Sequence, residues 1–344
     1  MRFDEFLERL DGLHFPRSSD AAHPDRPLIQ SARSVVEAAL LDDQFLADCI
    51  ERELDLIDSG TSRRGLVPFF TMPDLGIRFA LGYWAPGHTA GAHEHTAWTV
   101  TAVCRNELEV LTYDRAESYR TRQLVPKNRF QAAAGRVGFI SEPCIHEPKN
   151  TSTDWSLSFH LSSPQDGKPV ENDYQELPAL RSRRQRFAGL GDHPYASVIS
   201  ARQRNKCMHQ LARIVVSMKA TQSPLLLERC RRMGSTVTRN FLGQALAHQA
   251  GMSARPQRII LARTHRLLDL RLRNDGDMVA LDAETPQGPV EEFAIADAAA
   301  EAMTFILREE IFEADALPGN LSEAERMAVI EALEETGLFT RVAA

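Results

Sequence analysis

The sequence predicts two differently built halves: an all-β barrel preceded by a helical segment, and a mainly α-helical C-terminal domain. Three observations predict this division. Apolar residues recur at helical spacing over residues 28–58, short β-type runs follow from 66 to 163, and helical spacing returns beyond a polar stretch at 162–178. The chain has 344 residues, of which 43% are hydrophobic, and is therefore long enough for two globular units.

The N-terminal elements follow from their periodicity. The run "LIQSARSVVEAALLDDQFLADCIERELDLID" keeps its apolar residues on one helical face and ends near Ser59 and Gly60. Residues 1–62 are therefore assigned to a helical preface. Residues 63–165 are assigned to the barrel, because "IRFALGYW", "AWTVTAVC", "LEVLTY", "RVGFIS" and "WSLSFHLS" have the length and composition of strands and are separated by turn-forming residues.

The C-terminal half begins at a polar boundary. Proline, glycine and polar residues dominate "SSPQDGKPVENDYQELP", so residues 166–205 are assigned to a linker. Residues 206–344 are assigned to an α-rich domain. Within it, residues 206–250 fit two or three helices, and residues 267–295 fit a small β-meander that turns at "NDGD" and "TPQG".

Near the end of the sequence, "LSEAERMAVIEALEETGLFTRV" carries signals for both ends of a helix. Ser322 and Glu325 have the spacing of a capping box. Gly337 fits the position just after the helix, where a left-handed backbone conformation favours glycine. The residues that follow are expected to form a short strand.

Composition argues against several classes of protein. No stretch is long and apolar enough to span a bilayer, and "MRFDEFLERLDGLHF" carries acids where a signal peptide needs an uninterrupted apolar core. The five cysteines are scattered without a CxxC pair, which argues against a disulfide framework. The net charge is −7, with "RSRRQR" at 181–186 as a local exception. We therefore expect a soluble, cytoplasmic protein without a membrane or nucleic-acid partner.

The stretch "PGHTAGAHEHTAWTV" places two histidines one residue apart on an expected strand. Side chains alternate between the two faces of a strand, so His93 and His95 point to the same side and can bind one metal ion. His146, in "GFISEPCIHEPKN", would complete a three-histidine site across the barrel, a spacing that resembles a cupin. Cupins commonly place a carboxylate shortly after the second histidine, where this chain has Thr99 and Val100, so three neutral ligands are predicted.

Together, "HEHTAWTVTAV" and "IHEPKNTSTDWSLSFHLSSP" resemble the thiol dioxygenases, the group of cysteine dioxygenase and 3-mercaptopropionate dioxygenase. The resemblance covers residues 60–165 and implies Fe(II) held by the three histidines, with O2 as co-substrate. It also implies that Ser158 and His160 match the first two members of a Ser-His-Tyr relay close to the iron. The third member is Ser162 here in place of tyrosine, and Val100 stands where animal enzymes have the cysteine that crosslinks to that tyrosine.

The same resemblance indicates substrate contacts. In "SRRGLVPFF", Arg64 precedes "GLV" as does the family arginine that binds the substrate carboxylate, and Arg63 is its rival. Trp98 is a candidate substrate contact and otherwise a wall of the barrel. Cys144, two residues before His146, is either close to the metal or a small buried thiol.

The last part of the chain, from "EEFAIADAAAEAMTFILREE" onward, looks like a winged-helix unit and is weakly similar to those appended to cupin-type hydroxylases. Such modules bind DNA, dimerise, or present a peptide to a neighbouring catalytic barrel, and the fold does not choose among these roles. A homodimer through the C-terminal domain and a peptide substrate are the partners that this resemblance would add.

Three functions therefore compete. The first, which we favour, is an Fe(II)-dependent dioxygenase that oxidises a thiol, a small mercapto-acid or cysteine-like molecule, to a sulfinate. The second is an iron oxygenase of the same fold that acts on a larger metabolite or peptide held by the C-terminal domain. The third is a metal- or ligand-sensing cupin joined to a winged-helix module, without turnover. Zinc and nickel also bind three imidazoles, so the ligand set leaves the metal open.

Overall fold

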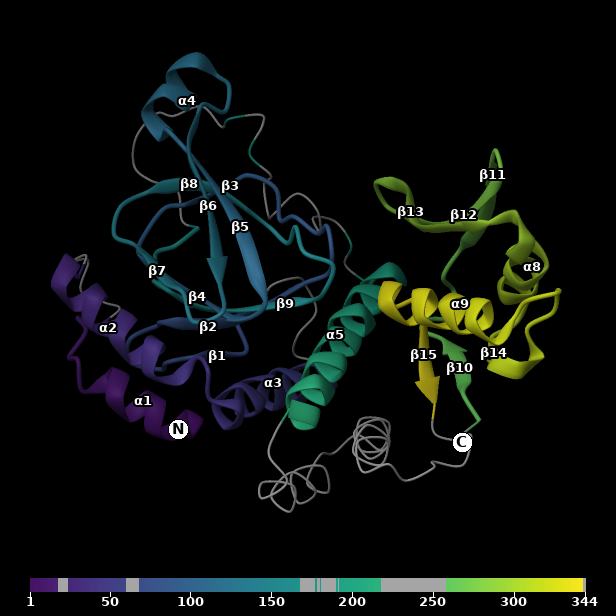
Figure 1. Ribbon diagram of the computed structural model, residues 1–344, viewed down its shortest axis with the longest axis horizontal. Coiled ribbons are helices and arrows are strands. Elements are labelled where there is room, and N and C mark those ends of the chain that lie inside the picture. The colour runs from purple at the N-terminus through teal and green to yellow at the C-terminus, as the bar shows by residue number, and fades with distance from the viewer. Residues whose placement is uncertain are drawn as a thin grey trace. The chain divides into compact units, whose positions relative to one another are not determined.

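The computed structural model of the protein divides into two units (Figure 1). The first unit comprises Met1–Glu53 and Leu66–Arg186, and the second comprises Leu54–Gly65 and Phe187–Ala344. The structure describes residues 1–17, 24–59, 68–167, 177, 180, 190, 192–217 and 258–342. None of the helices in these ranges has the length and apolar character needed to cross a membrane.

The N-terminal region contains α1 (Phe3–Asp11), α2 (Arg26–Ala39) and α3 (Asp43–Asp58). The continuous helical pattern of the sequence is thus divided between α2 and α3. Helix capping explains the break, because the Asp42 carboxylate accepts hydrogen bonds from the backbone N–H groups of Gln44 and Phe45 in the first turn of α3. The sequence prediction missed this because apolar spacing continues across the cap.

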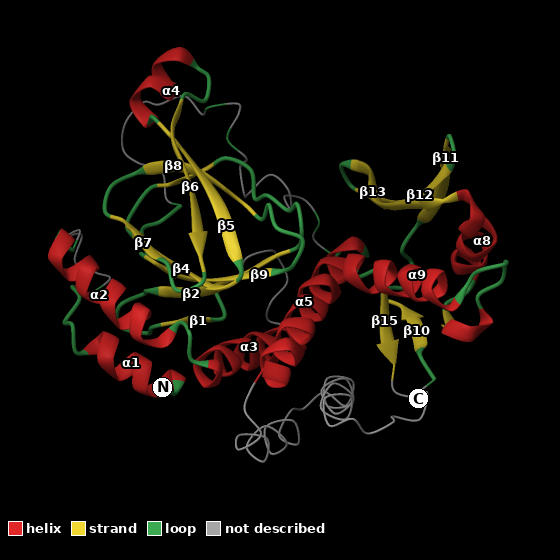
Figure 2. Ribbon diagram, viewed as in Figure 1, coloured by secondary structure: helices red, strands yellow, loops and turns green. Residues whose placement is uncertain are grey.

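Antiparallel strands of the first unit form two sheets (Figure 2). The five-stranded sheet has the order β1 (Phe70–Thr71), β2 (Arg78–Trp84), β9 (Ser156–Ser162), β4 (Thr99–Arg105), β7 (Val137–Ile140). The four-stranded sheet has the order β3 (His93–His95), β8 (Cys144–Lys149), β5 (Glu107–Tyr113), β6 (Pro126–Ala133), and α4 (Arg115–Thr121) lies between β5 and β6 in the sequence. These antiparallel sheets fit the predicted cupin domain.

One face of the five-stranded sheet is covered by helices. Phe79 on β2 and Phe159 on β9 pack against Phe6 from α1, and Phe159 also packs against Phe45 from α3. All four side chains are completely buried, and their neighbouring ring centroids lie between 4.9 and 6.1 Å apart. Because side chains alternate along a strand, the residues on either side of Phe79 and Phe159 face the barrel interior.

The second unit combines helices with two three-stranded antiparallel sheets. One sheet has the order β14 (Ile311–Glu313), β10 (Ile260–Arg263), β15 (Phe339–Val342), and the other has the order β11 (Leu270–Asp275), β12 (Met278–Thr285), β13 (Gly288–Ala296). Among the described residues from 190 onward, the helical elements are α5 (Tyr195–Ser217), α8 (Ala300–Arg308), α9 (Glu323–Thr336) and the 3-10 turns Asp297–Ala299 and Ala314–Ala316. The predicted meander is confirmed, since β11, β12 and β13 pair consecutively in antiparallel register.

The prediction of a mainly α-helical C-terminal domain is not confirmed by the part that the structure describes, in which residues 206–217 of α5 are helical and the rest is mixed. Over residues 258–342 six strands accompany two α-helices. The sequence prediction missed β10 and β14, because strands of three or four residues are too short to show a two-residue period. In addition, α5 begins at Tyr195, inside the predicted linker 166–205. The helices expected at 218–250 lie outside the described residues, and the winged-helix assignment stays a prediction.

Helix α9 begins and ends as the sequence predicts. Ser322 Oγ accepts a hydrogen bond from the Glu325 backbone N–H, and the Glu325 carboxylate accepts one from the Ser322 backbone N–H at 2.8 Å, which together form the capping box. Gly337 has φ +75°, the left-handed conformation expected after a helix. The strand predicted after this glycine is β15.

Candidate metal centre

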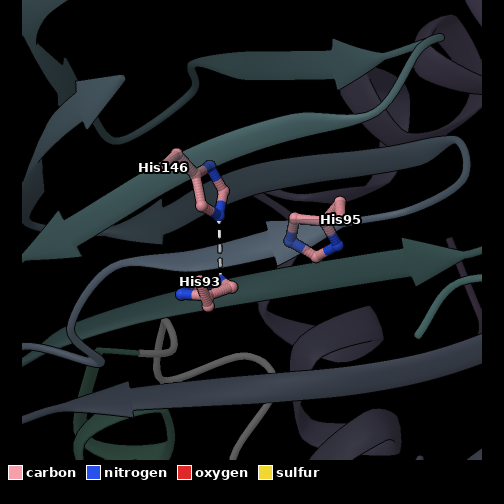
Figure 3. A group of neighbouring side chains, drawn as sticks. All are labelled: His93, His95 and His146. Carbon is pink, nitrogen blue, oxygen red and sulfur yellow. Dashed lines mark hydrogen bonds between the residues drawn. The ribbon is translucent and has the colours of Figure 1, made fainter. Parts of the chain in front are cut away.

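Strand pairing brings the three predicted histidine ligands together. In the antiparallel pair of β3 and β8, His93 lies opposite His146, and His95 shares the face of His93 because it is two residues further along β3. Figure 3 shows the three imidazoles converging on one region. One ligand nitrogen from each ring lies within 4.8 Å of the other two, and the Nε2 atoms of His93 and His146 are 3.0 Å apart.

Neighbouring acceptors define which nitrogen of two rings carries the proton. His93 Nδ1 lies 2.9 Å from the carbonyl oxygen of Gly91, and His95 Nδ1 lies 3.0 Å from the Asp166 carboxylate. Each oxygen can only accept, so Nδ1 of each ring donates and Nε2 keeps its lone pair. Both rings are about 95% buried, which limits exchange with bulk water. The Nε2 atoms of His93 and His95 are therefore unprotonated and can bind a cation.

The donor set fits a transition metal ion. Two nitrogens about 2.1 Å from one ion and at right angles to each other lie about 3.0 Å apart, which is the separation of Nε2 in His93 and His146. Imidazole ligands suit iron, zinc, copper and nickel. Thr99, at a position where cupins commonly have a carboxylate, is 1% exposed and supplies none. These three histidines are the one group of metal-ligand type found among the residues that the structure describes.

Asp166 is a site residue that the sequence prediction missed. Its carboxylate accepts from His95 Nδ1–H and, through Oδ1, from the backbone N–H of Thr96 at 3.0 Å. Burial raises the pKa of Asp166, but the hydrogen bonds from His95 and Thr96 and the positive charge of Arg78 oppose burial, and the net shift is downward. The carboxylate is therefore ionised at neutral pH. It follows the last barrel strand by a few residues and was assigned to the linker because proline and glycine surround it.

The residue between the first two ligands faces the opposite side of β3. Glu94 forms an ion pair with Arg115, and the Tyr119 hydroxyl donates to Glu94 Oε2 at 2.6 Å. Burial, together with the bond to Glu94, raises the pKa of Tyr119, so its hydroxyl stays a donor. These contacts with α4 fix the outer face of β3 while His93 and His95 occupy the inner face.

The two predicted relay residues form a hydrogen-bonded pair in the barrel interior. Trp84 Nε1–H donates to Ser158 Oγ at 2.8 Å, and Ser158 Oγ lies 2.8 Å from His160 Nε2. Because Ser158 accepts from the indole, its own hydrogen is available for His160 Nε2. His160 Nδ1 can then donate to Thr101 Oγ1 at 3.3 Å. Ser162, where the resemblance to thiol dioxygenases predicts a tyrosine, is half-buried on the same strand.

The remaining predicted site residues have different outcomes. Trp98 is 3% exposed and stacks on Phe15, with ring centroids 5.2 Å apart, so its role as a substrate contact stays a prediction. Cys144 lies opposite His95 in the strand pair, and burial raises the pKa of its thiol. The carboxylate clamp Arg64 and its rival Arg63 lie outside the described residues, as does the basic run 181–186.

No family model and no curated protein matches the chain. Solved structures with local similarity include oxalate oxidase in complex with glycolate, at 21% identity and a TM-score of 0.23, covering 27% of this chain and 45% of that chain. Another is a conserved protein with a double-stranded β-helix domain from Klebsiella pneumoniae, at 13% identity and a TM-score of 0.24, covering 31% of this chain and 86% of that one.

A cupin superfamily protein from Desulfitobacterium hafniense is similar at 11% identity and a TM-score of 0.22, covering 30% of this chain and 81% of that one. The chain thus spans less than half the length of the oxalate oxidase and more than two thirds of the two smaller proteins. Each similarity involves less than a third of this chain.

Proposed function

We propose that the first unit is a mononuclear non-haem iron dioxygenase, which oxidises a thiol, a small mercapto-acid or cysteine-like molecule, to a sulfinate. The convergence of His93, His95 and His146 in a group without a carboxylate carries the proposal. Three neutral ligands leave a ferrous ion its full double positive charge, which favours an anionic thiolate. The resemblance of the two histidine segments to thiol dioxygenases supports the same reaction.

The proposed reaction balances without an external reductant. Both atoms of O2 enter the sulfinate, and the sulfur supplies the electrons that reduce them. Bound Fe(II) would supply the electron exchange between thiolate and oxygen. The chain itself holds the three imidazoles in place, and on β9 it offers the hydrogen-bonded pair Ser158 and His160.

Iron content is the direct test of the site. Protein purified without oxygen should contain about one ferrous ion per chain, because the three nitrogens form a single site. His93→Ala and His146→Ala should each abolish this binding, while His88→Ala should not, because His88 is exposed in the same unit and outside the histidine group. Elemental analysis measures the metal and also identifies it. Iron content unchanged in both ligand variants would remove the proposed site.

The substrate class is tested separately by oxygen uptake. With cysteine or 3-mercaptopropionate, the iron-loaded protein should consume O2 and release the corresponding sulfinate, identified by its added mass. Ser162 favours a second candidate, because it lacks the phenol group that the resemblance places in the relay. That candidate is an iron oxygenase acting on a larger metabolite or peptide. Full iron occupancy without oxygen uptake on either thiol would favour it.

A further inference from the structure

Given the metal site proposed above, on which this step rests, we propose that Asp166 is a positioning residue for His95. We further infer that a bound metal ion and the turn of residues 163–167 stabilise each other. The spacing of the histidines in the sequence predicts neither the role of Asp166 nor that of this turn.

Both oxygens of the Asp166 carboxylate bind consecutive residues at the end of β3. Oδ2 accepts from His95 Nδ1–H and Oδ1 accepts from the backbone N–H of Thr96, each at 3.0 Å. The side chains of His95 and Asp166 are 6% and 8% exposed, so water competes little for these bonds. The carboxylate therefore fixes both the ring orientation and the protonated nitrogen of His95, which leaves Nε2 as the metal-binding atom.

The turn that carries Asp166 is itself bound to two parts of the barrel. Gly167 N–H donates to Thr96 Oγ1 at 2.8 Å, beside the metal ligands. On β2, Arg78 Nη2 donates to the carbonyl oxygens of Ser163 and Asp166 at 2.8 and 2.7 Å. These contacts are independent of the carboxylate. The position of Asp166 therefore depends on a closed turn rather than on one side-chain rotamer.

Metal binding and closure of the turn are then linked. A cation on Nε2 draws electron density from the imidazole and makes Nδ1–H a stronger donor to Asp166. This coupling is reciprocal. If a bound metal favours the closed turn by a given factor, closing the turn raises the affinity for the metal by that same factor. The linkage predicts that a metal ion slows hydrogen exchange at the backbone amides of Thr96 and Gly167, whose hydrogen bonds belong to the closed turn.

The test compares Asp166→Asn with the full-length wild-type chain, using Co(II) as the probe. The amide has a single acceptor oxygen for two donors, so one of the two bonds is lost. We expect the variant to bind Co(II) about 10 to 100 times more weakly, with an altered visible spectrum. Metal-dependent slowing of exchange at Thr96 and Gly167 should also disappear. Glu109→Gln is the control, because Glu109 pairs with Arg129 on the barrel surface.

Each outcome supports or overturns the positioning role. Equal Co(II) affinity, spectrum and exchange protection in Asp166→Asn and wild type would overturn it while leaving the metal site intact. A lower melting temperature of the metal-free variant with an unchanged rise on adding Co(II) would also overturn it, because Asp166 would then be structural. Wild-type protein that binds no Co(II) would remove the metal site itself.

A second variant keeps the test open if Asp166→Asn does not fold. Thr96→Val removes the acceptor of the Gly167 N–H, together with the long 3.5 Å contact from Thr96 Oγ1 to the Gln165 carbonyl oxygen, and preserves the size of the side chain. It should weaken Co(II) binding by about two- to tenfold, the effect of one hydrogen bond. Wild-type affinity in Thr96→Val would show that closure of the turn is not linked to the metal.

Discussion

Gly82 leaves the space that the polar chain in the barrel interior occupies. A Cβ at this position would lie 2.5 Å from Ser158 Oγ and 2.7 Å from Trp84 Nε1, closer than atoms in contact can approach. These are the two atoms joined by the hydrogen bond from the indole to the serine. The added Cβ would also lie 3.1 Å from His160 Nε2. A single methyl group at position 82 would therefore disturb both hydrogen bonds of Ser158.

Gly82→Ala should lower the free energy of unfolding by about 1 to 3 kcal/mol, the usual cost of overpacking an interior. Urea unfolding measures this change. Gly138→Ala on β7 is the matched control, because the nearest atom to its added Cβ is the Thr101 carbonyl oxygen at 4.0 Å. If Gly82→Ala unfolds at the wild-type urea concentration, the interior of the barrel is less tightly packed than these distances indicate.

The histidine group shows which site residues a sequence pattern can predict, and Asp166 shows which it cannot. His93 and His95 were predicted to share a face from the two-residue period of a strand, and the structure places them so. His146 was predicted as the third ligand because its place in a second β segment gives a histidine spacing that resembles a cupin. Asp166 has no comparable signal, because its contact with His95 spans 71 residues and depends on a turn after the last strand. Local periodicity does not encode such a contact.

Among the elements, α9 depends on the capping box at its N-terminus. Ser322→Ala should destabilise the second unit by about 1 kcal/mol, because one backbone N–H loses its acceptor. The matched control is Thr304→Ala in α8, whose hydroxyl bonds to a carbonyl within its own helix. Denaturant unfolding of both variants measures the difference. Equal unfolding midpoints for Ser322→Ala and Thr304→Ala would contradict a stabilising cap.

The effect of Ser322→Ala should also depend on pH. Hydrogen bonds from the Ser322 side chain and backbone lower the pKa of Glu325 below its ordinary value of 4.5. A carboxyl whose pKa is lowered by folding stabilises the folded state above that ordinary value, and this contribution is lost as the pH falls through the lowered pKa. The difference between wild type and Ser322→Ala should therefore be largest near neutral pH and decrease below pH 4.5. A constant difference would exclude the charged bond.

Element length explains which parts of the fold were predicted correctly. The meander of β11, β12 and β13 has strands of six to nine residues and glycines at its turns, so period and turn signals agree. β10 and β14 have only four and three residues, and their pairing depends on distant segments. The break between α2 and α3 was missed for another reason. α2 ends at Ala39 and Asp42 caps the start of α3, but the apolar spacing continues across this break.

At the scale of the whole molecule, the predicted end of the barrel falls inside the first unit. The sequence placed that end at residue 165, whereas the first unit continues to Arg186. Asp166 lies just beyond the predicted end, and Leu177 is fully buried in a cluster with Ala92, Tyr113 and Ile145. The polar composition of this segment predicted a linker, although Asp166 and Leu177 within it contact residues of the barrel.

Two shortened chains test this boundary. A chain ending at residue 186 should bind Co(II) like the full chain, whereas one ending at residue 165 should bind it about 10 to 100 times more weakly, because His95 loses Asp166. Both chains lack most of the second unit, so the comparison isolates residues 166–186. Circular dichroism must show that both are folded. Full-length Asp166→Asn separates loss of the carboxylate from loss of Leu177, and equal Co(II) affinity of the two shortened chains would place the end of the metal-binding unit at residue 165.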